Sequence, residues 1–361
     1  MNKLIIERFG ELIKQIKAEQ LNAQLEGDQG EVTVQGFRLK STMKAFNALR
    51  MLDFEVKDSK DLKGIPGIGK GTMQRVQEIL DTGTLAELKH KYTKEKQSKI
   101  TSIQELEEVI GIGPVLAKKL VVDHGITSVD KLKAAIKSGK YQANDKIKLG
   151  LKYVGVVEGK IPRKEVTKIK SYLQKMVAKV DPGLQMIICG SYRRGKATSG
   201  DIDVLLYHPE MKTLDETKQP EKHGLDSYLE IFVDDLKDDG FIVDHITDKN
   251  YKTNYMGFAR YKNKPVRRID IKLIPFKSLH TATLYFTGPG ELNVMMRQRA
   301  DKKFGMLLNQ YGLYKKEGDN LVKLKINSEK DVFDKLKMEY LTPQQREDFA
   351  GTKPVIKSLK K

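Results

Sequence analysis

Two short runs in which acidic and aliphatic residues alternate constrain the fold of this 361-residue chain most strongly. The first is DIDVLL, residues 201–206, and the second is RRIDIKLI, residues 267–274. Successive side chains of a β-strand point to opposite faces. Each run therefore predicts a strand with an aliphatic buried face, and its opposite face carries Asp201 and Asp203 in the first run and Asp270 in the second.

If the two strands are neighbours, the three aspartates form one candidate divalent-metal site, because Mg²⁺ prefers oxygen ligands. Two such ions can lower the pKa of an attacking hydroxyl and stabilise both the attacking and the leaving oxygen of phosphoryl transfer. A lone D-x-D pattern is more often an exposed strand edge with solvated carboxylates. The third aspartate and the turn upstream favour catalysis.

That turn is GSYRRG, residues 190–195, which lies a few residues before the first strand. Its backbone amides and the hydroxyl of Ser191 suit a triphosphate, and an arginine balances the charge that moves onto pyrophosphate. The turn and the three aspartates together predict a nucleotidyltransferase.

An internal repeat lies in the N-terminal half. GIPGIGKGTMQRVQEIL, residues 64–80, is echoed by VIGIGPVLAKKLVVDHG, residues 109–125. A glycine-bounded turn that starts a helix leaves backbone N–H groups pointing outward, where the helix dipole also favours a phosphate. One such turn can simply join two packed helices. Two copies, followed by Lys70 and by Lys118 and Lys119, favour binding to the DNA backbone without sequence specificity.

The rest of the pattern divides the chain into a helical N-terminal half and an α/β half beyond Gly155. We expect a helix over residues 1–25, a polar break at EGDQGEVTVQG, residues 26–36, and a second helix from Ser41. Further helices are expected at 162–179 and 290–304, and strands at 185–189, 201–207, 254–261 and 266–275. The chain ends in a basic tail, KPVIKSLKK, which suits either a localisation signal or a DNA contact.

Composition supports a polyanionic partner. Sixty-six Lys and Arg against 48 Asp and Glu give a net charge of +18, which points to nucleic acid before an acidic membrane. No apolar run reaches the roughly 18 residues of a membrane span and the N-terminus does not look like a signal. The single cysteine, Cys189, excludes an intramolecular disulfide and a multi-cysteine zinc site. We expect a soluble protein of a reducing compartment.

With these motifs in order, the sequence resembles the family X DNA polymerases, and the DNA polymerase beta branch in particular. The likeness runs from about Lys44 to about Asp348 and is most specific in these stretches: CGSYRRGKATSGDIDVLLYHP, RRIDIKLIP, LYFTG, IGIGP, GLKYVGVVEGKIPR and SEKDVFD. It implies an α+β multidomain fold: a helical lyase-like domain with helix-hairpin-helix motifs, and a hand-like polymerase whose palm has a mixed sheet. The implied domains are 1–92, 93–162 with the second hairpin, the catalytic palm 163–276 and a nucleotide-selecting part 277–361.

The resemblance implies a gap-filling repair polymerase in which Asp201 and Asp203 bind two Mg²⁺ ions, for which Mn²⁺ can substitute, and Asp270 binds the catalytic ion and receives the primer hydroxyl proton. The implied nucleotide contacts are Lys160, Ser191, Arg194, Gly200, Tyr285, Phe286, Gly288 and Asn293. The implied DNA contacts are Arg38, Lys63, Gly67, Gly69, Lys70, Gly111, Gly113, Lys118, Arg268 and Arg297. A monovalent cation, Na⁺ or K⁺, would be held at the hairpins by main-chain carbonyls of Lys63, Ile65, Ile68, Glu107, Val109 and Ile112.

The implied partners are gapped or nicked double-stranded DNA and dNTPs, with no membrane and a monomeric protein. The implied location is the nucleus or another DNA-containing compartment, with a viral or organellar origin left open. The family also has a cis peptide just after the YFTG turn, which falls here on Gly288-Pro289, a pair in which proline makes the cis form accessible.

The sequence departs from the family at the position of the lysine that forms a Schiff base with 5′-deoxyribose phosphate, where Arg75 stands. Imine chemistry needs a neutral amine, and arginine effectively never loses its proton. We therefore expect no lyase activity by the usual nucleophile. Gly71 replaces a lysine of the same 5′-phosphate pocket, where Arg38 and Lys63 keep positive charge, and Lys70 or Lys44 is a weak candidate for a substitute nucleophile.

Three other positions bear on selectivity. Gly290 and Val294 replace residues that contact the incoming base and the template, and Gln310 aligns with a glutamate that stabilises the closed state. Fewer contacts to the nascent pair suggest lower fidelity. The first 36 residues match the family poorly.

Two alternatives stay open. An untemplated nucleotidyltransferase, such as a terminal transferase or an RNA-tailing enzyme, shares the Gly-Ser turn and D-x-D, although the paired hairpins and YFTG argue against RNA tailing. A DNA-end-binding scaffold with an inert catalytic half would bind gaps without extending them.

Overall fold

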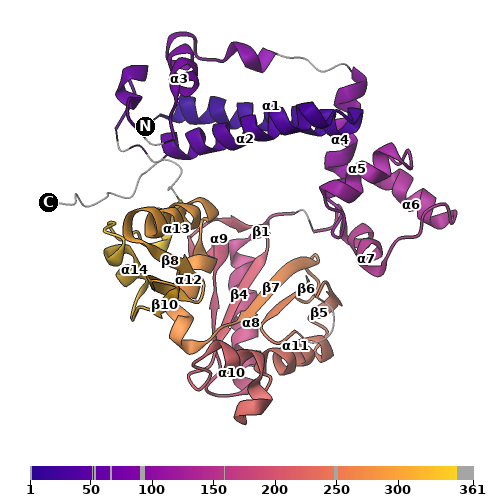
Figure 1. The fold of residues 1–361 in the computed structure, drawn as a ribbon. Helices are drawn as coiled ribbons and strands as arrows, with labels where there is room; N and C mark the ends of the chain where they lie inside the picture. The colour runs from indigo at the N-terminus through magenta and orange to yellow at the C-terminus, as the bar shows by residue number, and fades with distance from the viewer. Residues whose placement is uncertain are drawn as a thin grey trace. The chain divides into compact units, whose positions relative to one another are not determined.

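The computed structural model describes residues 2–50, 52, 54–65, 67–89, 94–157, 159–247 and 251–347 (Figure 1). The basic tail singled out in the sequence therefore lies outside the described residues. The chain divides into two compact units, Met1–Val154 and Gly155–Lys361, and the division falls where the sequence pattern changes from helical to α/β.

The first unit is helical. Its α-helices are α1 (Lys3–Glu26), α2 (Gln29–Arg50), α3 (Lys70–Thr82), α4 (Lys94–Glu107), α5 (Pro114–Val122), α6 (Val129–Lys137) and α7 (Asp145–Tyr153). Two 3₁₀ turns, η1 (Ser59–Leu62) and η2 (Ala86–Lys89), flank α3. Figure 1 shows α1 and α2 lying side by side as a long helical hairpin.

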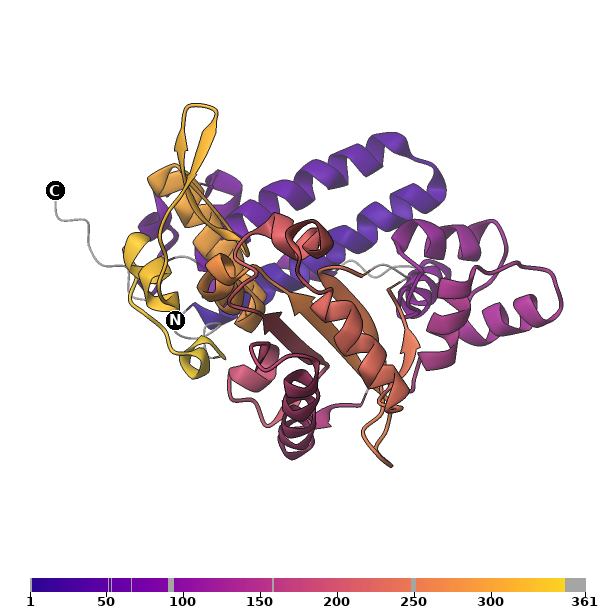
Figure 2. The same cartoon turned by 90° about the horizontal axis from the view of Figure 1, so that it is seen from below.

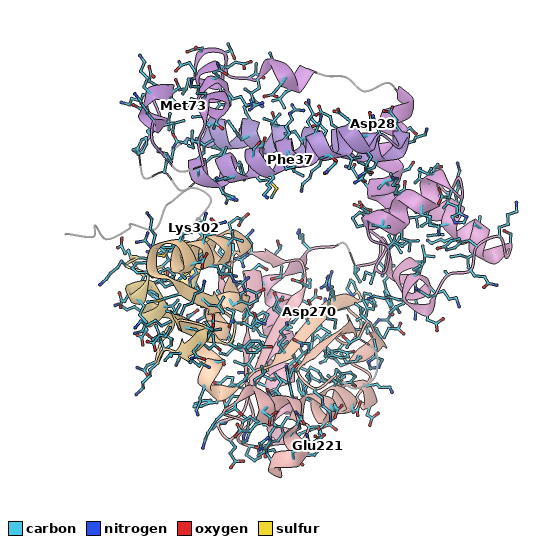
Figure 3. The ribbon with its side chains drawn as sticks, viewed as in Figure 1. Asp28, Phe37, Met73, Glu221, Asp270 and Lys302 are labelled. Carbon is cyan, nitrogen blue, oxygen red and sulfur yellow. The ribbon has the colours of Figure 1, made fainter. Side chains whose placement is uncertain are left out.

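The expected break over 26–36 is wrong, because α2 begins at Gln29 instead of Ser41. The chain reverses within two residues. Gly27 ends α1 in the left-handed region at φ 74°, and Asp28, labelled at this turn in Figure 3, accepts the backbone N–H of Glu31 at 2.9 Å. The pattern was missed because the buried positions of α2 include the polar Gln35 and Thr42, so its first half lacks apolar periodicity.

The two glycine turns adopt the same backbone geometry, which confirms that they are a structural repeat. Gly67 and Gly111 both have φ 97°, a value that favours glycine. Gly69 precedes α3 with φ −104° and ψ 179°, and Gly113 precedes α5 with φ −96° and ψ 175°. The second turn also packs tightly on α7: a Cβ at Gly150 would lie 2.1 Å from the carbonyl oxygen of Ile110.

The second unit is built on a five-stranded sheet in the order β2-β4-β7-β6-β5. Its strands are β2 (Gln185–Ile188), β4 (Ile202–Tyr207), β5 (Ile242–His245), β6 (Asn254–Ala259) and β7 (Arg267–Leu273). Only the β4–β7 pair is parallel, so the sheet is mixed as expected. Four of these strands agree with the expected runs to within two residues at each end, whereas β5 was not predicted.

The two faces of this sheet are covered by different helices. On one face, α8 (Arg163–Val180) and α11 (Tyr228–Asp238) pack through Ile169 and Phe232 against Ile202, Val204 and Ile271 of the sheet. On the other face, α12 (Leu279–Thr287) packs against Leu205 through Ala282. Side chains alternate along a strand, so Asp203 lies on the α12 face together with Leu205.

The remaining elements of this unit surround the sheet. They are β1 (Ile161–Pro162) paired with β3 (Thr198–Ser199), α9 (Gly190–Arg193), α10 (Leu214–Lys218), η3 (Pro220–His223), η4 (Phe276–Ser278), α13 (Gly290–Phe304), α14 (Glu329–Lys335) and α15 (Pro343–Glu347). A second sheet, β8 (Met306–Asn309), β9 (Gly312–Glu317) and β10 (Asn320–Lys323), follows α13, and Figure 2 shows its β9–β10 hairpin extending away from the helices. None of the helices in the described ranges combines the length and the apolar character that a membrane span requires.

Candidate active site

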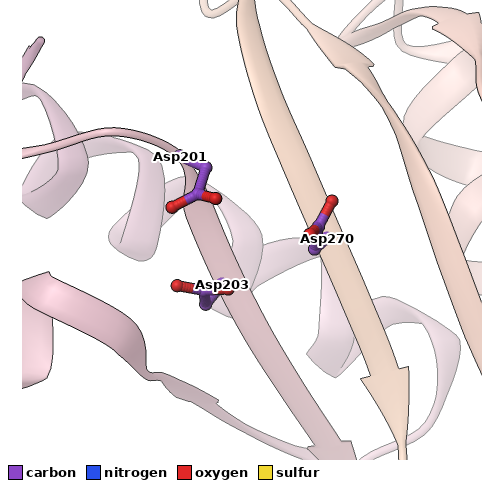
Figure 4. A group of neighbouring side chains, drawn as sticks. All are labelled: Asp201, Asp203 and Asp270. Carbon is purple, nitrogen blue, oxygen red and sulfur yellow. The ribbon is translucent and has the colours of Figure 1, made fainter. Parts of the chain in front are cut away.

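The parallel pairing of β4 with β7 brings the three predicted aspartates together. Asp203 of β4 lies directly opposite Asp270 of β7 in the register, and Asp201 immediately precedes β4 on the same face (Figure 4). One carboxylate oxygen from each residue lies within 4.8 Å of those of the other two. Three carboxylates at this separation fit the oxygen donor set that a divalent cation requires.

The carboxylates are partly buried and repel one another. Burial and then the charges of Asp201 and Asp270 raise the pKa of Asp203 to about 7. Burial and the charge of Asp270 also raise the pKa of Asp201, while the charges of Arg268 and Lys160 oppose that rise. A bound cation would remove this repulsion, since it supplies the opposite charge at the point where the three groups meet.

Arg268 lies on the same face of β7 as Asp270 and is paired with it. Its Nη2 donates to Oδ2 of Asp270 at 2.9 Å and its Nε to Oδ1 at 3.2 Å. The structure thus places Arg268 beside Asp270, where the guanidinium faces this carboxylate.

The predicted phosphate turn forms the short helix α9 and lies against Asp203. The Cys189 N–H donates to the Asp203 carbonyl oxygen at 2.9 Å, and Gly190 follows with φ 54°. A Cβ at Gly190 would lie 1.9 Å from Oδ2 of Asp203. Only glycine fits here, so Gly190 belongs to the site, although sequence reasoning selected the turn as a whole and gave this glycine no role of its own.

A cavity of about 420 Å³ adjoins the carboxylates and the phosphate turn. It is lined by Gly190, Ser191, Arg194, Asp201, Asp203, Tyr285, Phe286, Thr287, Gly288, Pro289, Gly290 and Asn293. Six of the eight expected nucleotide contacts are in this lining, while Lys160 and Gly200 are not. The expected cis peptide at Gly288-Pro289 is present in the same wall.

The aromatic wall of the cavity is held by contacts to α13 and β7. Asn293 Nδ2 donates to the Tyr285 carbonyl oxygen at 2.7 Å, and the guanidinium of Arg297 lies 4.7 Å from the centre of the Tyr285 ring. Lys272 Nζ lies 4.9 Å from the centre of the Phe286 ring. These contacts fix both rings.

The two arginines of the turn are held by acidic residues near the end of the described chain. Arg194 donates from Nε to Oε2 of Glu347 at 2.5 Å and from Nη1 to the Thr287 carbonyl oxygen at 2.7 Å. Arg193 donates to both carboxylate oxygens of Glu329, at 3.1 and 2.8 Å. Glu329 and Glu347 lie more than 130 residues from their partners, so no local sequence signal pointed to them.

Comparison with known protein families supports this geometry. A model described as DNA polymerase beta palm matches residues 160–276, one described as DNA polymerase beta thumb matches 282–347, and one described as helix-hairpin-helix domain matches 1–85. The chain is therefore similar to the family X DNA polymerases in its N-terminal, palm and thumb regions. The helix-hairpin-helix model matches residues 1–85 and so includes the first 36 residues. The expectation that these residues match poorly is therefore wrong for this domain.

The curated proteins that this chain resembles include two DNA polymerases lambda and one DNA nucleotidylexotransferase. DNA polymerase lambda of Arabidopsis thaliana is 32% identical over 364 residues, covering 96% of this chain and 62% of the relative. DNA polymerase lambda of Rattus norvegicus is 29% identical, covering 87% and 53%. DNA nucleotidylexotransferase of Xenopus laevis is 25% identical, covering 86% and 64%. The chain thus spans between half and two thirds of the length of these relatives.

Two of the lysines expected to contact DNA lie on the helices that follow the two glycine turns. Lys70 is exposed at the first position of α3, whereas Lys118 Nζ donates to the Gln24 carbonyl oxygen at 2.6 Å. The carbonyls of Ile65 and Val109, which were expected to help hold a monovalent cation, accept equivalent backbone bonds from Ile68 and Ile112 at 3.1 and 2.9 Å.

Arg75, which we expect at the family's Schiff-base position, lies in an ion-pair network with Arg38. Arg75 Nε pairs with Glu87, and Arg38 Nη2 lies 2.7 Å from Oε2 of the same carboxylate. Arg38 also pairs with Glu19. Burial alone would raise the pKa of Glu87, but the hydrogen bonds from the two arginines outweigh it and hold the pKa below its usual value. The charge of Arg38, expected to serve the 5′-phosphate, is already balanced by these carboxylates.

Three residues that differ from the family, Gly290, Val294 and Gln310, have the following surroundings in the structure. Gly290 begins α13 and has open space where a Cβ would stand. Val294 is 48% exposed on the same helix. The Gln310 carbonyl oxygen accepts from the Thr281 hydroxyl at 3.1 Å.

Proposed function

We propose that this chain is a DNA-directed DNA polymerase that fills short gaps during DNA repair by transferring a nucleotide from a dNTP to a primer 3′-hydroxyl. The observation that carries the proposal is the pairing of Asp203 with Asp270 across two parallel strands, beside a cavity bounded by the phosphate turn. The matches to the palm and thumb models of DNA polymerase beta support the same assignment.

In this proposal the three aspartates hold two Mg²⁺ ions, or Mn²⁺ in their place. When bound, the ions lower the pKa of the attacking hydroxyl and stabilise the charge on the attacking and leaving oxygens. Asp201 and Asp203 serve both ions, while Asp270 serves the catalytic ion and accepts the primer hydroxyl proton. The pairing of Arg268 with Asp270 supports this role, because the guanidinium places a positive charge 2.9 Å from the carboxylate oxygen Oδ2.

The cavity would hold the incoming dNTP. Ser191 and Arg194 bind its phosphates from the turn, with Lys160 and Gly200 as further contacts, and the wall formed by Tyr285, Phe286, Gly288 and Asn293 faces its sugar and base. Arg297, which lies on the Tyr285 ring, would monitor the nascent pair from the minor groove.

Gapped or nicked duplex DNA would be gripped by the two hairpins. Their outward N–H groups, with Lys63, Lys70 and Lys118, suit the sugar-phosphate backbone, and carbonyls of the same turns would hold Na⁺ or K⁺. We further propose four domains with boundaries after residues 92, 162 and 276, a monomeric state, and a location where DNA is repaired, such as the nucleus.

The decisive assay uses a one-nucleotide-gapped duplex with dNTP and Mg²⁺, and Asp270→Ala as the control. Templated single-nucleotide extension that disappears in Asp270→Ala is the expected result. Extension that persists on a single strand without template would favour a terminal transferase, in line with the likeness to the Xenopus nucleotidylexotransferase. Gap binding without any extension would mean a scaffold and would refute the proposal.

A further inference from the structure

A second cavity, of about 390 Å³, lies on the opposite side of the five-stranded sheet from the carboxylates. We call it the α8 groove. It is lined by three lysines, two tyrosines and two hydroxyl residues from α8 and from the turn between β6 and β7. Because α8 packs on the face that carries Ile202 and Ile271, the α8 groove is separated from the active site by the sheet itself.

The α8 groove is positively charged along its length. Lys168 and Lys175 are exposed on α8 and are spaced by seven residues, about two helical turns or roughly 10 Å. Lys262 reaches the same groove from the β6–β7 turn. Within the described ranges these three lysines form no ion pair, and Lys262 Nζ lies 5.5 Å from the centre of the Tyr261 ring. Asp239 accepts the hydroxyl of Tyr172, one of the lining residues, at 2.6 Å.

Two aromatic rings form the floor of the α8 groove. Tyr172 and Tyr261 have ring centroids 5.7 Å apart, and Tyr172 is backed by Phe241 at 5.0 Å. Both tyrosines are only partly buried. Lys262 is one of the few non-glycine residues with positive φ among those described, at 53°, and the turn closes through the Lys264 N–H bonding the Tyr261 carbonyl oxygen at 3.1 Å. The ring and the lysine are thus presented by one tight turn.

We propose that the α8 groove binds single-stranded nucleic acid, which goes beyond the polymerase function. Lysines placed along a groove suit the phosphates of an extended backbone, and the tyrosine rings suit base stacking, the combination typical of single-strand sites without sequence preference. The hydroxyls of Thr167 and Ser171 in the same lining can donate to phosphate oxygens. An acidic peptide would use the lysines but would leave the aromatic floor without a matching group. An unpaired strand is therefore the better fit.

The test measures binding of fluorescein-labelled oligothymidylate by anisotropy, with an excess of unlabelled gapped duplex to occupy the duplex-binding surfaces. Lys168→Glu/Lys175→Glu should weaken binding at least tenfold. Tyr261→Ala should weaken it about fivefold or more, and Tyr261→Phe should bind like the unmodified chain because stacking is kept. The matched control is Lys218→Glu/Lys222→Glu, an equal charge change on exposed residues outside the α8 groove, and it should stay within twofold.

Melting temperature and gap extension should be unchanged in the lysine variants, which separates this proposal from the polymerase assignment. The proposal is overturned if the unmodified chain does not bind the oligonucleotide, or if the control pair weakens binding as much as the groove pair. It is equally overturned if folded Tyr261→Ala binds normally, or if polyglutamate of equal length displaces the oligonucleotide as well as unlabelled oligothymidylate does.

Discussion

Gly190 lies against Asp203 so closely that a methyl group at position 190 would stand 1.9 Å from the carboxylate oxygen Oδ2. The same glycine has φ 54°, which a residue with a Cβ rarely adopts. The turn at 190–195 and the strand β4 that carries Asp203 are therefore fitted to each other at one backbone position.

Gly190→Ala should slow nucleotide addition by about 100-fold or more, because a displacement of about 1 Å at a reacting group has an effect of that size. Single-turnover extension of a gapped duplex measures the change. Gly10→Ala, at a helical position with open space, is the control and should react like the unmodified chain. Normal extension by Gly190→Ala would show that Asp203 can shift without loss.

Sequence pattern predicted the faces of β4 and β7 but not their pairing. The alternation in each strand is local, whereas the match of Asp203 with Asp270 joins two residues more than 60 positions apart in the sequence. The family resemblance supplied what local pattern could not. Neither approach predicted that Arg193 pairs with Glu329 and Arg194 with Glu347, although Glu329 lies in the quoted stretch SEKDVFD. The two glutamates are brought to the turn only by tertiary packing.

The local sequence pattern also failed to predict the start of α2, where the buried side chains are polar. The first half of α2 buries Gln35, whose Nε2 donates to Glu31 at 2.6 Å, and such a helix shows no apolar stripe. The glycine turns gave the opposite result, because a φ of 97° at Gly67 and at Gly111 is a local requirement that the sequence displays directly.

Asp203→Asn should abolish extension while leaving the fold at least as stable without metal. Burial and the neighbouring carboxylates raise the pKa of Asp203 to about 7, so its negative charge is unfavourable in the folded chain and a neutral amide relieves that repulsion. Melting scans in chelator should place the variant at or above the unmodified chain. Mg²⁺ should then raise the melting temperature of the unmodified chain only, since a ligand stabilises the state that binds it; an equal rise in both would show that the metal binds elsewhere.

The unmodified chain should give no borohydride-trapped adduct with 5′-deoxyribose phosphate. Arg75 cannot supply a neutral amine, and its guanidinium is engaged with Glu87. Arg75→Lys alone should restore little, because Glu87 beside the new amine would favour its charged form, while Arg75→Lys with Glu87→Gln should trap more. A strong adduct in the unmodified chain would mean that another lysine, such as Lys70 or Lys44, acts as the nucleophile.

Glu347→Gln should raise the apparent KM for dNTP more than it lowers kcat. Glu347 and the Thr287 carbonyl hold Nε and Nη1 of Arg194, which leaves Nη2 as the donor for the triphosphate in the role we propose for Arg194. Loss of a charge-assisted hydrogen bond of about 1.5 kcal/mol or more corresponds to roughly a tenfold change in nucleotide affinity. Glu347→Asp keeps the charge, so its KM for dNTP should lie between those of the unmodified chain and Glu347→Gln. Lys196→Gln removes only the second partner of Glu347, whose Nζ lies 2.6 Å from Oε1, and should change the KM less than Glu347→Gln does. Tighter nucleotide binding by Glu347→Gln would instead mean that Glu347 competes with the triphosphate for Arg194.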